Sequence, residues 1–276
     1  MRILDAHQHF WRPSRGDYGW LAAAPPVLNR DYLPEDLQGS LARYGVDRTI
    51  VVQAAPTEAE TDFMLDLAER TPFIAGVVGW LDMDGDAFPD RLAHYSTRPK
   101  FVGIRPMLQD LEDDEWILRP RVLRNLQLVA ESGLAFDFLT LPRHLPHVAT
   151  ALQQTPGLRA VIDHIAKPFI ADGTLDPWRA DIERVASFRN VSCKLSGIIT
   201  EADPQGWSVA DLRPYIHHVV NCFGPERLIF GSDWPVCRVA GDYGDVLSAL
   251  LLALPPRLRG DEGIFRTNAE RFYRLV

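Results

Sequence analysis

Apolar and polar positions along this chain follow two patterns that alternate repeatedly. Short apolar runs rich in β-branched residues are each followed by a longer stretch in which apolar residues recur every three or four positions. The first pattern is typical of strands buried on both faces, and the second of amphipathic helices. The predicted strands span residues 2–10, 49–54, 74–81, 102–106, 134–140, 160–165, 191–196 and 228–233.

Helical patterns fill the segments between these runs. The predicted helices span residues 36–44, 58–70, 87–95, 120–131, 145–154, 177–187, 212–223 and 245–253, and a further helix over 263–275 closes the chain. Eight strand–helix repeats predict a (β/α)8 barrel. The alternative is a doubly wound open sheet, which usually carries a glycine-rich turn after an early strand, whereas residues 53–56 here read Gln-Ala-Ala-Pro. We therefore expect one α/β domain over residues 1–276, folded as a TIM-type barrel.

Composition and charge narrow the class of protein. The 276 residues are 46% hydrophobic and carry a net charge of -8, which argues against a nucleic-acid partner. The three cysteines have no ligand-like spacing, which favours a reducing compartment. Because no signal-peptide pattern and no apolar run of membrane-spanning length is present, we expect a cytoplasmic protein without a membrane partner. Its oligomeric state stays open.

Candidate catalytic residues follow from the barrel prediction, since catalytic side chains of such barrels lie at the carboxyl ends of the strands. His7 and His9 are two positions apart near the end of the first predicted strand, so they point to the same side. Two imidazoles there suit a metal site or an acid–base cluster. The structural alternative is one buried, hydrogen-bonded histidine and one exposed histidine.

Two later strands end in further ionisable residues. Asp233 ends an apolar run and precedes Trp-Pro, which favours a general base or a metal ligand over a helix cap or a partner for a histidine. His164 is expected to be a third imidazole in the same pocket, with Asp163 facing away from the barrel interior and orienting a neighbour. Arg105 and Lys194 are fixed cations in apolar strands, so each must bind a substrate oxygen or pair with a barrel carboxylate.

The segment 11–34 is long and rich in aromatic residues, proline and glycine. In a barrel it would follow the first strand at the catalytic face, so we expect either a functional lid or packing that seals the barrel mouth.

Taken together, these motifs resemble the amidohydrolase superfamily and, within it, the branch of sugar lactonases. The resemblance spans nearly the whole chain. The segments that carry it are 4–11, 18–21, 52–54, 103–105, 163–168, 193–197 and 230–235.

The resemblance implies hydrolysis of an aldonolactone such as L-fuconolactone or L-rhamnonolactone. Binuclear members of the superfamily carry a bridging lysine or glutamate near strand four, where this chain has Arg105, and predicted strand five lacks the usual histidine. We therefore expect no two-metal site. A single Zn²⁺ held by His7, His9 and Asp233 would leave an open position for water. The resemblance also implies that this branch can work without a divalent metal, so we expect no strictly required cofactor.

These expectations combine into one mechanistic hypothesis. Asp233 acts as general base, the histidines orient water or polarise the carbonyl, and Arg105 and Lys194 donate to the substrate. The predicted sugar contacts are apolar packing by Trp20, Trp80 and Trp234, and hydroxyl recognition by Gln53 and Asp82. The rival hypotheses are a metal-dependent decarboxylase of the same superfamily and a non-catalytic barrel that binds a sugar acid.

Overall fold

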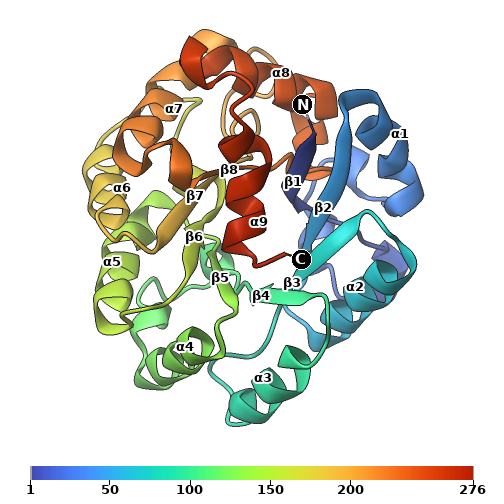
Figure 1. Ribbon diagram of the computed structural model, residues 1–276, viewed down its shortest axis with the longest axis vertical. Coiled ribbons are helices and arrows are strands. Elements are labelled where there is room, and N and C mark those ends of the chain that lie inside the picture. The colour runs from blue at the N-terminus through green and yellow to red at the C-terminus, as the bar shows by residue number, and fades with distance from the viewer. Residues whose placement is uncertain (1, 276) are drawn as a thin grey trace.

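The protein is described by a computed structural model that covers residues 2–275. Eight strands form one parallel sheet in which each strand pairs with the next strand along the chain. Figure 1 shows the strands arranged in a ring with the helices around it. The strands are β1 (Ile3–Gln8), β2 (Val46–Val52), β3 (Ile74–Gly79), β4 (Phe101–Ile104), β5 (Ala135–Phe138), β6 (Ala160–Ile162), β7 (Val191–Leu195) and β8 (Leu228–Phe230).

The ring is closed by backbone contacts between the end of β1 and the segment after β8. Gln8 forms a parallel bridge with Trp234. The amide of Asp233 donates to the carbonyl of His7 over 2.8 Å, and the amide of His9 donates to the carbonyl of Trp234 over 2.7 Å. The predicted (β/α)8 barrel is therefore confirmed, and its closure brings residues 7–9 beside residue 233.

The helices lie outside the ring, as the apolar periodicity predicts (Figure 1). The predicted bounds of α2 and α5 agree with the structure, and those of the other outer helices differ by at most three residues at either end. The outer helices are α1 (Pro34–Tyr44), α2 (Glu58–Arg70), α3 (Phe88–Ser96), α4 (Pro120–Ser132), α5 (Leu145–Gln154), α6 (Trp178–Ala186), α7 (Val209–Phe223) and α8 (Tyr243–Ala253).

The C-terminal segment closes one end of the barrel. The single helix predicted over 263–275 is instead a π-helical turn, Gly263–Thr267, followed by the short helix α9 (Asn268–Phe272). Phe272 and Tyr273 pack with Leu4, Ala135 and Ile229 in one apolar cluster. These last three residues lie at or near the start of their strands, so α9 covers the amino-terminal end of the ring, across which it is drawn in Figure 1. The carboxyl ends of the strands lie at the opposite end of the ring, which α9 does not cover.

The aromatic segment 11–34 folds over that opposite end as three short 3₁₀ turns, Pro13–Arg15, Gly19–Ala22 and Pro26–Leu28. Trp11 and Tyr32 are buried and joined by an antiparallel bridge, which agrees with the prediction of packing at the barrel mouth. Trp20 is only half-buried and lines the pocket described below. Within residues 2–275, none of the helices is both long and apolar enough to cross a bilayer.

Candidate active site

A pocket of about 230 Å³ opens at the carboxyl ends of the strands. Its lining side chains come from several different strand ends and the loops that follow them, as is usual for a barrel enzyme. The polar and aromatic ones are His9, Trp20, Arg105, Gln109, Asp110, His164, Lys167 and Asp233.

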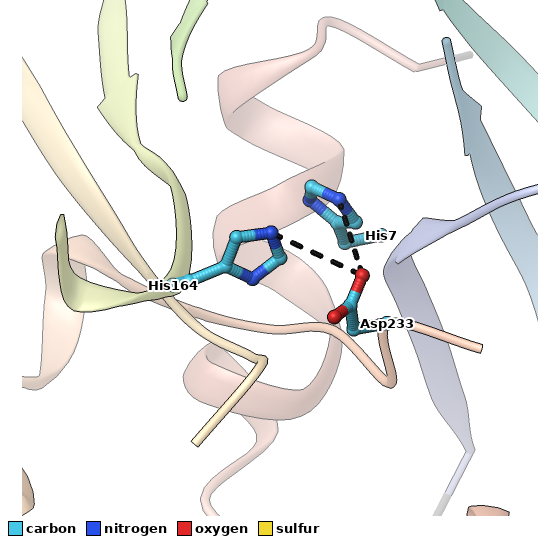
Figure 2. Close-up of side chains that lie close together, drawn as sticks. All are labelled: His7, His164 and Asp233. Carbon is cyan, nitrogen blue, oxygen red and sulfur yellow. Dashed lines mark ion pairs between the residues drawn. The ribbon is translucent and has the colours of Figure 1, made fainter. Parts of the chain in front are cut away.

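Three imidazoles surround the carboxylate of Asp233. The Nε2 atoms of His9, His7 and His164 lie 3.2, 3.8 and 3.9 Å from Asp233 Oδ1. The ring centres of His7 and His164 are 4.4 Å apart. Figure 2 shows both of these rings turned toward the carboxylate. Histidines and an aspartate that are far apart in the chain thus meet at one point, as the sequence pattern predicts.

An unusual backbone conformation delivers His164 and Lys167 to the pocket. Strand β6 ends at Ile162, three residues earlier than predicted, because His164, Ile165, Ala166 and Lys167 all have φ between 49° and 62°. Such left-handed conformations cost roughly 1–2 kcal/mol per non-glycine residue, so a run of four is held in place by its surroundings. Asp233 has φ 56° as well. Backbone strain is therefore concentrated where the polar side chains converge.

Two glycines make room for the histidines. A Cβ atom at Gly231 would lie 2.6 Å from the Cβ of His7, and one at Gly197 would lie 2.7 Å from Nδ1 of His164. Gly197 also has φ 65°, a conformation that side chains disfavour. The sequence motifs contain both glycines, but a single sequence carries no signal that they face the imidazoles.

A buried ion cluster lies beneath the pocket, and it corrects the expected orientation of Asp163. Lys194 is fully buried, with its Nζ 2.5 Å from Asp137, 3.0 Å from Asp163 and 3.1 Å from His7 Nδ1. Of the two roles left open for Lys194, the structure provides the pairing with barrel carboxylates, and these partners enclose its ammonium group. Asp163 faces the barrel interior, not away from it, because both Lys194 and Arg105 pair with its carboxylate.

Arg105 extends from this cluster to the wall of the pocket. Its Nη1 atom lies 3.2 Å from Asp163 Oδ2 and 3.4 Å from His7 Nε2, and its Nη2 donates to the carbonyl of Gln53. The sequence left open whether Arg105 binds substrate or pairs with a barrel carboxylate. The structure provides the ion pair with Asp163 and also places Arg105 in the pocket lining.

The surroundings fix the protonation of the central groups. Burial favours a higher pKa for Asp233, but the nearby imidazoles of His164 and His9 outweigh it and lower the pKa below its ordinary value. Burial, reinforced by Lys194 for His7, lowers the pKa values of His7 and His164 well below 6.5. At neutral pH the pocket therefore contains an ionised Asp233 beside the neutral rings of His7 and His164.

Four predicted sugar contacts lie outside this pocket. Gln53 is fully buried and its Nε2 donates to the carbonyl of Arg105 over 2.8 Å, so it supports the backbone instead of lining the pocket. Trp80 and Asp82 line a second hollow of about 650 Å³, which shares Trp20 with the first pocket. Trp234 is buried with its ring packed against Phe10 and Tyr32. Of the three predicted tryptophans, Trp20 is the one that lines the pocket around Asp233.

The donor atoms of His7, His164 and Asp233 all lie within 4.8 Å of one another, so this trio forms a group that could hold a metal ion, with His164 in the place that the prediction gave to His9. Two imidazoles and a carboxylate suit a single Zn²⁺ with an open coordination position. Both ring nitrogens of His7, however, also face cationic groups, Lys194 at 3.1 Å and Arg105 at 3.4 Å. The donor set therefore fits one divalent cation, and the neighbouring positive charges weaken its binding.

Comparison with known proteins gives matches over essentially the whole chain. A family model described as Amidohydrolase matches residues 4–275. An L-fucono-1,5-lactonase of Burkholderia ambifaria is 44% identical, with 99% of this chain and 95% of that protein covered. An L-fucono-1,5-lactonase of Burkholderia multivorans is 36% identical, with 99% and 96% covered. The crystal structure of a Burkholderia multivorans amidohydrolase with bound zinc superposes with a TM-score of 0.93 at 34% identity, with 100% of both chains covered.

Proposed function

The chain belongs to the amidohydrolase family, and we propose that it is a lactonase that opens L-fuconolactone or a related aldonolactone to the aldonic acid. The observation that carries this proposal is the position of Asp233, an ionised carboxylate among three imidazoles in a small pocket with Arg105 on its wall. A water nucleophile, a base and a fixed positive charge are what hydrolysis of a cyclic ester requires. The names of the two curated relatives support the choice of substrate.

In the proposed reaction, a water molecule attacks the lactone carbonyl carbon while Asp233 Oδ1 takes its proton. His9 assists because its Nδ1 atom donates to the carbonyl of Val52 over 2.7 Å. The Nε2 atom lies 3.2 Å from Asp233 Oδ1, where it is placed to accept a hydrogen bond once that carboxyl has taken up the proton. The proton taken from water is thus held between two fixed acceptors.

Positive charge near the carbonyl oxygen stabilises the tetrahedral intermediate. We assign this role to Arg105, assisted by Lys167, which lines the pocket where Lys194 does not. When the intermediate collapses, the bond between the carbonyl carbon and the ring oxygen breaks, and the ring oxygen receives the proton held by Asp233 and His9. A divalent cation held by His7, His164 and Asp233 would supply a more acidic water and a Lewis acid.

A proton-release assay over a panel of aldonolactones tests the proposal, because lactone opening acidifies the medium without releasing carbon dioxide. We expect turnover of L-fuconolactone or a close stereoisomer. The same assay after chelation, with the metal content measured, determines whether a divalent cation is needed. Release of carbon dioxide from an unsaturated or aromatic acid, or binding of sugar acids without turnover of any lactone, would overturn the proposal.

A further inference from the structure

We propose that Glu60, a buried carboxylate behind the pocket wall, is a positioning residue that holds Arg105 and Trp20 in place through the backbone of residues 53–55. This inference rests on the proposed function, because it assigns Glu60 a part in that reaction. Glu60 lies in the first turn of α2 and its side chain is fully buried. An acidic residue in the first turn of a helix is usually explained by the helix dipole, which requires no burial.

The carboxylate of Glu60 binds two consecutive backbone amides. The amide of Ala54 lies 3.0 and 3.1 Å from the two carboxylate oxygens, and the amide of Ala55 lies 2.9 Å from Oε2. Burial raises the pKa of Glu60 to about 8 even though the amides of Ala55 and Ala54 lower it, so ionising this acid is costly and these two amides are the main groups that favour its carboxylate form. The side chain therefore supports the turn that follows β2.

The same turn holds three pocket side chains through successive carbonyl groups. The carbonyl of Val52 accepts from His9 Nδ1, that of Gln53 accepts from Arg105 Nη2, and that of Ala54 accepts from Trp20 Nε1 over 2.8 Å. His9, Arg105 and Trp20 all line the pocket around Asp233. Residues 52–54 thus act as a scaffold whose carbonyl groups orient one wall of the site.

Peptide planarity connects these two sets of hydrogen bonds. In a trans peptide, the carbonyl of one residue and the amide of the next point in opposite directions from one rigid plane. Glu60 holds the amide edges of the planes 53–54 and 54–55, whose carbonyl edges hold Arg105 and Trp20. The plane 52–53, which holds His9, is supported differently, because the amide of Gln53 donates to Val78 in β3 over 2.8 Å. Loss of Glu60 should therefore disturb Arg105 and Trp20 and spare His9.

Glu60→Gln tests whether Glu60 positions Arg105 and Trp20 but not His9. The substitution keeps the size of the side chain but replaces one acceptor oxygen with an NH₂ group that cannot accept a hydrogen bond. At pH 9, where Glu60 in the native protein is mostly ionised, we expect kcat for the lactone to fall by roughly tenfold to a hundredfold, as for other small displacements of a positioned group. KM should change less, because Arg105 acts on charge that develops after binding. In ¹⁵N-labelled protein, the Trp20 indole signal and the Arg105 guanidinium signal should shift or broaden, and the His9 Nδ1 signal should stay in place.

Met64→Ala is the matched control, since Met64 is buried one turn further along α2 and its apolar side chain does not accept hydrogen bonds from the turn after β2. It should lower the free energy of unfolding by about 2–5 kcal/mol and leave all three signals and kcat unchanged. Unchanged kcat and an unchanged Trp20 signal in Glu60→Gln would overturn the proposal.

A measurement on the native protein covers the case in which Glu60→Gln does not fold. Hydrogen exchange of the Ala54 and Ala55 amides should be as slow as exchange in β2, and rapid exchange at both would overturn the proposal. If the native protein opens no lactone, the proposed function fails, whereas the NMR signals and hydrogen exchange still report whether Glu60 supports the turn.

Discussion

Replacement of Lys194 by methionine removes the centre of the ion cluster beneath the pocket. Lys194 is the shared partner of Asp137 and Asp163, which are both fully buried. Methionine keeps the apolar stem of the side chain and its packing. The variant therefore leaves two buried carboxylates, of which Asp163 keeps its ion pair with Arg105 at 3.2 Å.

The expected loss of stability in Lys194→Met follows from the burial of Asp137. Burial already raises the pKa of Asp137 to about 6, even though Lys194 favours its ionised form. Loss of one partner from a buried ion pair costs about 3–5 kcal/mol, because the other charge is left uncompensated. We expect a loss of that size at pH 8, where Asp137 in the native protein is ionised.

The loss should depend on pH in a defined direction. Without Lys194 the pKa of Asp137 rises further above its unfolded value of 3.8. At pH values between the unfolded pKa of Asp137 and its raised pKa in the folded variant, the folded state binds more protons than the unfolded state. The stability of the variant therefore falls as pH rises in this range, by up to about 1.4 kcal/mol per pH unit. At pH 5, where Asp137 is mostly protonated in both proteins, the loss should be at least about 1 kcal/mol smaller than at pH 8.

Urea unfolding of the native protein and of Lys194→Met at pH 5 and pH 8 measures these differences. Lys100→Met is a suitable control, because Lys100 donates to the carbonyls of Ala68 and Ile74 and not to a buried carboxylate. The control should lose similar stability at both pH values. An equal loss at pH 5 and pH 8 for Lys194→Met, or a loss below 1 kcal/mol at pH 8, would refute the reasoning.

Three further predictions concern the pocket. Gly231→Ala should lower the free energy of unfolding by about 1–3 kcal/mol and reduce turnover, since the added Cβ must displace His7. As a control, Gly39→Ala in α1 has open space around it and should raise the free energy of unfolding by about 0.5–1 kcal/mol. Chemical unfolding measures both variants, and an unchanged stability of Gly231→Ala would contradict the contact with His7. Trp80→Ala should change kcat/KM for the lactone by less than about threefold, because Trp80 lines the second hollow; a tenfold loss would place that hollow in the reaction site. In Glu60→Gln, which lacks the carboxyl group whose pKa is about 8, kcat/KM should be flat from pH 7 to 8, since the pKa of Asp233 lies below its ordinary 3.8 and that of His164 well below 6.5; a limb between these pH values would contradict these directions.

The sequence predicts the barrel and the meeting of its polar residues for a clear physical reason. Buried parallel strands leave long apolar runs, and the carboxyl ends of all eight strands lie on one face. His7, His9 and Asp233 could therefore be assigned to one cluster of side chains without coordinates. The comparisons with curated relatives then support the substrate class that the motifs suggest.

Other features depend on geometry that a single sequence does not contain. The depth of Lys194 within the ring is determined by the stagger of the strands. A lysine at the pocket surface would have the same sequence pattern around it, so the sequence does not distinguish the two positions. The left-handed turn at 164–167 contains no glycine, so no local signal marks it. Glu60 looks like an ordinary acid at a helix start, and only its contacts with Ala54 and Ala55 set it apart.

The most direct test of the reaction centre is the rate of lactone opening by Asp233→Asn. Asparagine tolerates the left-handed backbone at this position and keeps the side-chain shape, so the thermal midpoint should stay close to that of the native protein. An amide cannot take the proton from water, and we expect kcat to fall by at least about a hundredfold. Turnover within a few fold of the native rate would remove Asp233 from the chemistry.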